Sequence, residues 1–225
     1  INTGIKAGAC KGQEKDALSN GNDEFRNETF GSSTDPNLNF GGNISADYSL
    51  TKRQSLGMTY NFRFNKSYNS ILEVDNYSSG ILDNRTTNKE NALTRNHSAN
   101  LNYEIKTDSL GSKLSANISF LKYERKMNST NDSAPAGGGI PSIFHQSVPQ
   151  YIDNVGALLD YVHKTKGKTT WMVGGSYNNT KTDNDTKQDM ISENGYVNNE
   201  ARSNHFVYEE NIIGFYATAE MNMNE

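Results

Sequence analysis

Four segments of the chain alternate apolar and polar residues with a period of two: 40–50, 55–65, 99–106 and 114–120. Successive side chains of a β-strand point to opposite faces, so this pattern predicts strands with one apolar and one polar face. We call the apolar sets the apolar stripes. Their members are Phe40, Gly42, Ile44, Ala46, Tyr48 and Leu50; Leu56, Met58, Tyr60, Phe62 and Phe64; Ala99, Leu101, Tyr103 and Ile105; and Leu114, Ala116, Ile118 and Phe120.

Four further strands bring the expected number to about eight. Segments 155–161 and 171–177 alternate less cleanly, a long strand runs over about 205–222, and residues 5–9 form a short stub. The stripes of the first two are Val155, Ala157, Leu159 and Tyr161, and Trp171, Val173, Gly175 and Tyr177.

The connections between these strands alternate in length. Short turns are expected at Thr51–Gln54, Thr107–Gly111 and Lys164–Lys168, and long loops at about 10–38, 67–95, 124–152 and 180–204. The turns recur regularly, since Thr51, Asp108 and Thr165 are separated by 57 residues each time. The pattern predicts an all-β, antiparallel up-and-down meander, about eight strands of a transmembrane β-barrel, with short turns on one side and long loops on the other.

The apolar stripes are typical of a surface that faces lipid. The clean strands run to as many as 11 residues, the length that a tilted membrane strand needs. No stripe residue is charged, whereas the opposite face carries Asp47, Arg63, Glu104, Lys106 and Asp160. Aromatic residues gather at both stripe ends, as at the two membrane interfaces of a barrel. They are Tyr48, Tyr103, Tyr161 and Trp171 near the short turns, and Phe40, Phe62, Phe64, Phe120, Tyr123 and Tyr177 near the long loops.

Composition is consistent with this fold. Only 33% of residues are hydrophobic and the mean hydropathy is −0.80, but 12 Tyr and 9 Phe argue against disorder. A net charge of −4 gives no basic footprint for nucleic acid. A single cysteine, Cys10, excludes an internal disulfide, and we expect it to be an incidental loop thiol.

The C-terminal half resembles a known family. Phe206, Tyr208, Glu210, Ile212, Gly214 and Tyr216, spaced two apart, are similar to a motif of the Bacteroidota-type outer-membrane β-barrel family within the TonB-dependent receptors. Upstream stretches also fit: 96–98 with 101–103, the turn 108–114, and 181–185, so the resemblance covers about residues 39–222. Gly214 departs from the family, which favours Ala there.

The resemblance implies a receptor that imports a scarce nutrient, such as a ferric siderophore, another chelate or an oligosaccharide, from the bacterial outer membrane. Such receptors have a plug inside the barrel and an N-terminal segment that contacts the TonB partner. The sequence shows neither, and it lacks a terminal strand that ends in an aromatic residue. We therefore expect one domain, residues 1–225, that forms part of a larger barrel of about 22 strands and has two open edges that favour pairing between copies.

Residues with chemical potential are few. The loop 124–152 offers cationic and aromatic groups for an anionic chelate or a sugar, namely Arg125, Lys126, Phe144, His145, Gln146 and Tyr151, although self-packing of the loop is the favoured interpretation. His97, His145, His163 and His205 have no metal-ligand spacing. Asp183, Asp185 and Asp189 are spaced like a loose Ca²⁺ loop without its Gly and closing Glu. Ala136–Gly139 predicts a flexible tip. We expect no catalytic, cofactor or metal site, and no enzyme activity.

Two alternatives stay open. One is a complete small outer-membrane barrel of 8–10 strands that serves as an adhesin or structural anchor. The other is a soluble all-β carbohydrate-binding or adhesion module, which predicts stripes packed against a second sheet.

Overall fold

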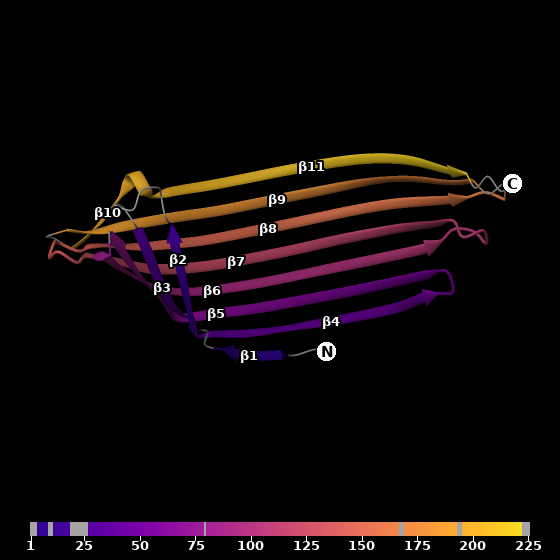
Figure 1. Cartoon of the computed structure of the whole chain (residues 1–225). Helices are drawn as coiled ribbons and strands as arrows, with labels where there is room; N and C mark the ends of the chain where they lie inside the picture. Colours follow the sequence, from indigo (N-terminus) through magenta and orange to yellow (C-terminus); the bar gives the residue numbers. More distant parts are fainter. Residues whose placement is uncertain are drawn as a thin grey trace.

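A single antiparallel sheet of 11 strands makes up almost all of the described part of the chain. The computed structural model describes residues 4–8, 11–18, 27–78, 80–166, 169–192 and 195–221, with side chains from Asp35 onward except Ser192. Eight strands follow one another as the expected meander (Figure 1). They are β1 (Gly4–Gly8), β4 (Asn37–Thr51), β5 (Gln54–Ser78), β6 (Ile81–Lys106), β7 (Lys113–Pro135), β8 (Ser142–Lys164), β9 (Thr169–Ser192) and β11 (Asn204–Met221).

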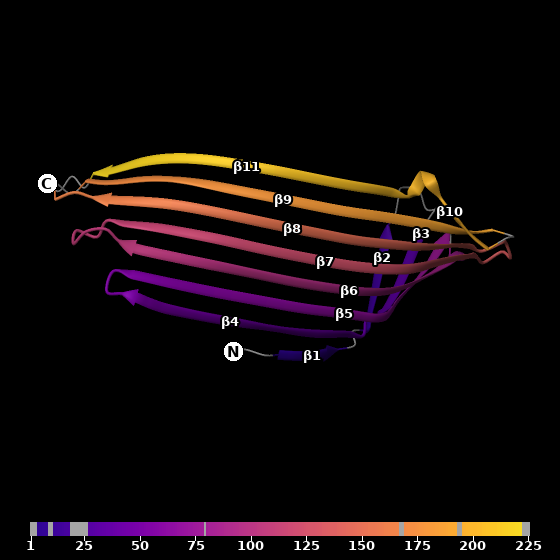
Figure 2. The same ribbon diagram turned by 180° about the vertical axis from the view of Figure 1, so that it is seen from behind.

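Three short strands lie off this path. β2 (Lys11–Leu18) and β3 (Asn27–Thr34) form a hairpin, and β3 pairs with residues 71–78 of β5. Both views show this hairpin running at a steep angle to the parts of the long strands that carry the apolar stripes (Figures 1 and 2). β10 (Gly195–Asn198) folds back on the end of β9, and a 3-10 turn (Glu200–Arg202) leads into β11. Cys10 and Asn222 lie outside the described residues.

The short connections are confirmed and gather at one end of the sheet (Figure 1), although Gly167 and Lys168 of the third turn lie outside the described residues. At the turn between β6 and β7, the Asp108 carboxylate accepts hydrogen bonds from the backbone N–H groups of Leu110 (2.8 Å) and Ser112 (2.9 Å). The pKa of Asp108 is lowered mainly by its hydrogen bond with the Ser112 side chain, and then by the backbone hydrogen bonds. Ser112 Oγ also accepts from the backbone N–H of Lys164 at 2.9 Å, so the wholly buried Ser112 joins two neighbouring turns.

The long connections lie at the other end of the sheet, as expected, but they are largely paired and not irregular. β5, β6, β7, β8 and β9 are 23–26 residues long and continue their pairing far beyond the apolar stripes. The segments 67–95, 124–152 and 180–204 are therefore mainly hairpins, and 10–38 contains β2 and β3. Where both faces of a hairpin are wet, polar residues fill both faces and the period of two disappears, although the backbone stays paired. Ala136–Gly139 lies at a tip, as expected.

The sheet is one layer. Among the residues with described side chains no apolar side chain is buried, and Ile44, Ile118 and Phe215 are 55%, 54% and 85% exposed. No second sheet covers the stripes in this part of the chain, contrary to what a soluble sandwich requires. No helix of the described residues is long and apolar enough to cross a membrane.

Candidate functional site

Strand register places all the apolar stripes on one face of the sheet, which we call the apolar face. Ile44 lies opposite Tyr60, and Tyr60 lies opposite Ala99. Farther across, Ile118 lies opposite Ala157, and Ala157 lies opposite Tyr177. Between them, Ala99 on β6 lies opposite Phe120 on β7, which is on the same face as Ile118, so the apolar face runs unbroken over β4 to β9. Soluble monomers rarely expose a continuous apolar surface larger than a few hundred Å², so this face requires a hydrocarbon environment.

Aromatic rings lie at both ends of the apolar face. Tyr48 and Tyr103 share a row near the short turns, because both pair with Leu56. At the other end Phe40 lies opposite Phe64, and the rings of Phe40 and Phe62 lie 5.3 Å apart. Tyr123 was assigned wrongly to this group. It pairs with Asn96 and Ile152 on the opposite face, because it is an odd residue on a strand whose stripe is even.

The opposite face is polar, and we call it the wet face. Register places Asp47, Arg63, Glu104, Lys106 and Asp160 there, as expected. Amide and hydroxyl groups bond across its strands. Asn43 Nδ2 donates to Asn61 Oδ1 at 2.8 Å, and Asn61 Nδ2 donates to Ser98 Oγ at 3.3 Å. Such ladders satisfy polar groups without apolar burial and suit a water-filled lumen.

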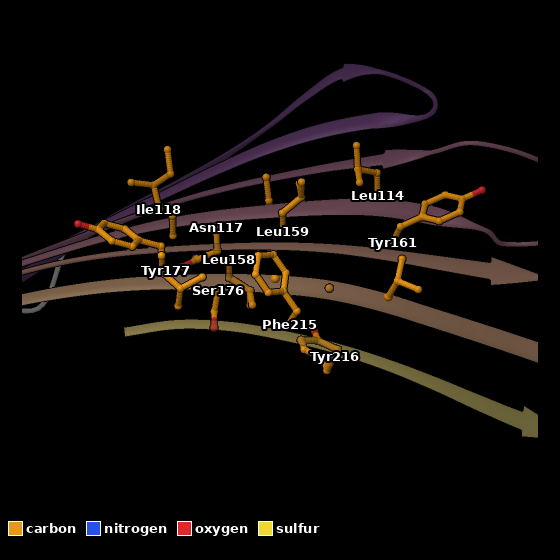
Figure 3. Close-up of a pocket in the computed structure, with 16 residues that line it drawn as sticks. Leu114, Asn117, Ile118, Leu158, Leu159, Tyr161, Ser176, Tyr177, Phe215 and Tyr216 are labelled. Atoms are coloured by element: carbon orange, nitrogen blue, oxygen red, sulfur yellow. The ribbon is translucent and has the colours of Figure 1, made fainter. Parts of the chain in front are cut away.

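An open depression of about 800 Å³ crosses β7, β8, β9 and β11. On the apolar face its floor consists of small residues, Ala116, Ala157 and Gly175. Figure 3 shows Ile118 and Tyr177 at one end and Leu114 and Tyr161 at the other, with Leu159 and Phe215 between them. The small residues thus leave a shallow groove on the apolar face. It extends along the strands from the pair Ile118 and Tyr177 to the pair Leu114 and Tyr161.

The five expected ligand contacts do not form one cluster. Lys126 and Tyr151 come together, with Nζ 5.8 Å from the ring centroid, on the side of the apolar face. Arg125 lies on the other side, 3.9 Å from a Glu90 oxygen. Phe144 and His145 also point to opposite sides, and the His145 ring lies 4.0 Å from that of Tyr196. Consecutive residues separate in this way because the segment is a strand pair and not an irregular loop.

Tyr196 was not identified from the sequence as a neighbour of His145. Only the fold of β10 onto β9 brings it there, and no local pattern in 195–198 indicates that contact.

The charged residues beyond the aromatic end form ion pairs. Glu124 binds Lys126 at 2.8 Å and Arg95 at 3.2 Å, and these cations lower the pKa of Glu124, with Lys126 contributing most. Asp185 binds Lys187 at 3.2 Å, and the Asp183 carboxylate accepts a hydrogen bond from His205 Nε2 at 2.9 Å.

The three residues with the spacing of a Ca²⁺ loop lie on the extended strand β9: Asp183, Asp185 and Asp189. An extended strand does not wrap around an ion. Within the described part of the chain, no group of three or more His, Cys, Asp or Glu side chains is arranged to hold a metal ion.

Comparison with known proteins agrees with this geometry. The family model described as "Outer membrane protein beta-barrel family" matches residues 105–225, more than half of the chain. The match includes β7, β8, β9 and β11, and therefore the groove and both of its ends. No curated protein matches the chain.

Proposed function

Since this chain belongs to the outer membrane protein beta-barrel family and lies in the bacterial outer membrane, we propose that it is barrel wall and outer hairpins of a TonB-dependent receptor that imports a nutrient. In this role it is a passive, non-catalytic segment. The apolar face holds the wall in lipid, the wet face lines the lumen, and the long hairpins make first contact with the ligand. The plug and the TonB-contact segment would belong to the rest of the receptor.

One observation carries the proposal: a charge-free apolar face lies back to back with a polar face whose side chains bond across strands. A wall of this kind separates lipid from a wide aqueous interior. The motif residues at every second position of β11, from Phe206 to Tyr216, also support the receptor class. Register places all of them on the wet face, where they would line the lumen of a transport barrel.

The proposed ligand is a ferric siderophore, another metal chelate or an oligosaccharide. Lys126 and Tyr151, Arg125, and Phe144 with His145 supply cationic and aromatic groups on the outer hairpins that suit such ligands. Because these groups lie on both sides of the sheet, Arg125 and Phe144 on the side of the wet face are the better candidates for a ligand that enters the lumen.

Uptake by cells tests the proposal. A strain that lacks the gene and its complemented parent are given labelled ferric siderophores, vitamin B12 and oligosaccharides, each with and without a protonophore. The proposal predicts accumulation of at least one compound that requires both the gene and the proton gradient. Uptake that survives the protonophore, or a loss of surface adhesion with every uptake intact, would instead favour the small-barrel alternative.

A further inference from the structure

A row of charges crosses the apolar face immediately beyond its outer end. Lys122, Asp153, Lys181 and Glu209 lie opposite one another on β7, β8, β9 and β11, and we call them the outer row. On β7 and β8 the outer row lies two residues beyond the last members of the apolar face, Phe120 and Val155. On β9 and β11 the polar residues Asn179 and Asn211 lie between the outer row and the last apolar side chains. The outer row therefore faces the exterior of the barrel wall at the depth where hydrocarbon ends.

The two lysines of the outer row are unpaired. Within the described chain, neither Lys122 nor Lys181 forms an ion pair, and both are exposed. The cations farther out behave differently, since Lys126 is bound to Glu124 and Lys187 to Asp185. Two free ammonium groups thus lie at the membrane boundary, while Lys126 and Lys187 farther out on the same two strands are neutralised by neighbouring carboxylates.

The groove on the apolar face lies directly below the outer row on the same strands. Ile118 and Tyr177, at its outer end, are four residues from Lys122 and Lys181, which is about 13 Å along a strand. An acyl chain in the groove would therefore rise past Phe120 and Val155 to the lysines. The floor of small residues admits such a chain, whereas a flat surface of Leu and Ile would give it no defined place (Figure 3).

We propose that β7, β8, β9 and β11 form a binding site for lipid A, the phosphorylated glycolipid of the outer leaflet. Its phosphate binds Lys122 and Lys181, and an acyl chain occupies the groove. The long-hairpin end of an outer-membrane barrel is extracellular, which places the outer row in the leaflet that contains this lipid. Asp153 and Glu209 supply oxygen ligands of the kind that Mg²⁺ takes, so Mg²⁺ bound with the phosphate strengthens the complex. The inference uses the membrane location only and not the import role.

Native mass spectrometry of the purified protein in detergent tests the site. The probes are diphosphorylated lipid A, dephosphorylated lipid A, phosphatidylethanolamine and inorganic phosphate, each with and without Mg²⁺. We expect diphosphorylated lipid A to bind at least about tenfold more tightly than the other three, because only it has both phosphates and several acyl chains. We expect Mg²⁺ to increase that binding. The double variant Lys122→Gln/Lys181→Gln should lose about tenfold in affinity.

The matched control is Lys126→Gln/Lys187→Gln. It removes the same charge from the same two strands and the same face, but from lysines that are already ion-paired. It should retain binding within about twofold. A further variant, Ala157→Leu, keeps the face apolar and fills the groove, so it should weaken lipid A binding without changing charge.

Equal losses in the two double variants would overturn the site, since unpaired lysines would then have no special part. Equal binding of dephosphorylated lipid A or phosphatidylethanolamine would show that the surface takes any membrane lipid, and would also overturn it. Each variant is first shown to fold by its heat-dependent shift in electrophoretic mobility, so that loss of structure is not read as loss of binding.

Discussion

The phenol of Tyr216 on β11 donates a hydrogen bond to the carboxylate of Asp160 on β8, across the full width of β9. The residue between them is Gly174. A Cβ atom at Gly174 would lie 2.5 Å from Cζ of Tyr216, so this contact exists only because the position has no side chain. The Tyr216 ring covers Gly174 and shields the backbone of β9. Such coverage stabilises a sheet at a position where glycine alone would weaken it.

Gly174→Ala is therefore expected to destabilise the protein, although alanine is the smallest possible addition. The methyl group displaces the Tyr216 ring and breaks its bond to Asp160, and overpacking of this kind costs about 1–3 kcal/mol. The measurement is the free energy of unfolding in urea, in lipid vesicles. Gly137→Ala is the control, because nothing lies within 4 Å of its Cβ position. Equal stabilities of the two variants would contradict the contact.

Ser112 gives a second prediction, at the turn end of the sheet. Ser112→Ala removes the wholly buried hydroxyl that accepts the hydrogen bond from the backbone N–H of Lys164, at an expected cost of about 0.5–1.5 kcal/mol. Urea unfolding again measures the change. Ser109→Ala, in the same turn but exposed, should be nearly neutral. If both variants are neutral, Ser112 does not join the two turns as described.

The strands that cross the apolar face were predictable, and the outer hairpins were not. The strands of Ile44, Tyr60 and Ile118 can be recognised in the sequence because one face of each meets lipid and the other meets water. Apolar and polar residues therefore alternate along them. Beyond the membrane, water is on both sides, and residues such as Thr86 and Asn88 have no reason to alternate, although Thr86 still donates to Ser133 across a strand pair. The candidate ligand contacts stay a prediction, and the sequence could not show that they lie on opposite sides of the sheet, because the face of Arg125 or Phe144 depends on that unseen pairing.

The two faces differ in what they tolerate. Ile118→Lys puts a charge into hydrocarbon near the middle of the apolar face, and should destabilise the folded barrel by about 2–4 kcal/mol in vesicles. Ser119→Lys, the next residue on the same strand, points to the wet face and should cost far less. A larger penalty at Ser119 than at Ile118 would mean that the faces are assigned the wrong way round.

The ion pairs of Glu124 predict a pH dependence. The pKa of Glu124 is lowered in the folded state by Lys126 and then by Arg95, so its contribution is complete above the ordinary glutamate value of about 4.3. It is lost as pH falls through the lowered folded value. Glu124→Gln should thus be less stable than the wild type by less than about 1 kcal/mol at neutral pH.

The same comparison at a pH below the lowered folded pKa of Glu124 checks the sign, because the carboxylate is then protonated in both states and the difference between wild type and Glu124→Gln should vanish. Urea unfolding at the two pH values is sufficient. A difference that grew as the pH fell would contradict the assignment of these ion pairs.

The most direct test of the lipid-facing surface is a nitroxide scan of β7 in a bilayer. Each residue from Leu114 to Leu121 is replaced in turn by a spin-labelled cysteine, in a Cys10→Ser background that removes the single native thiol. Collision with oxygen, which concentrates in hydrocarbon, is compared with collision with a water-soluble nickel complex. Leu114, Ala116, Ile118 and Phe120 should favour oxygen, and Ser115, Asn117 and Ser119 should favour nickel. A profile without a period of two, or one with the opposite phase, would contradict a membrane wall with this face in lipid.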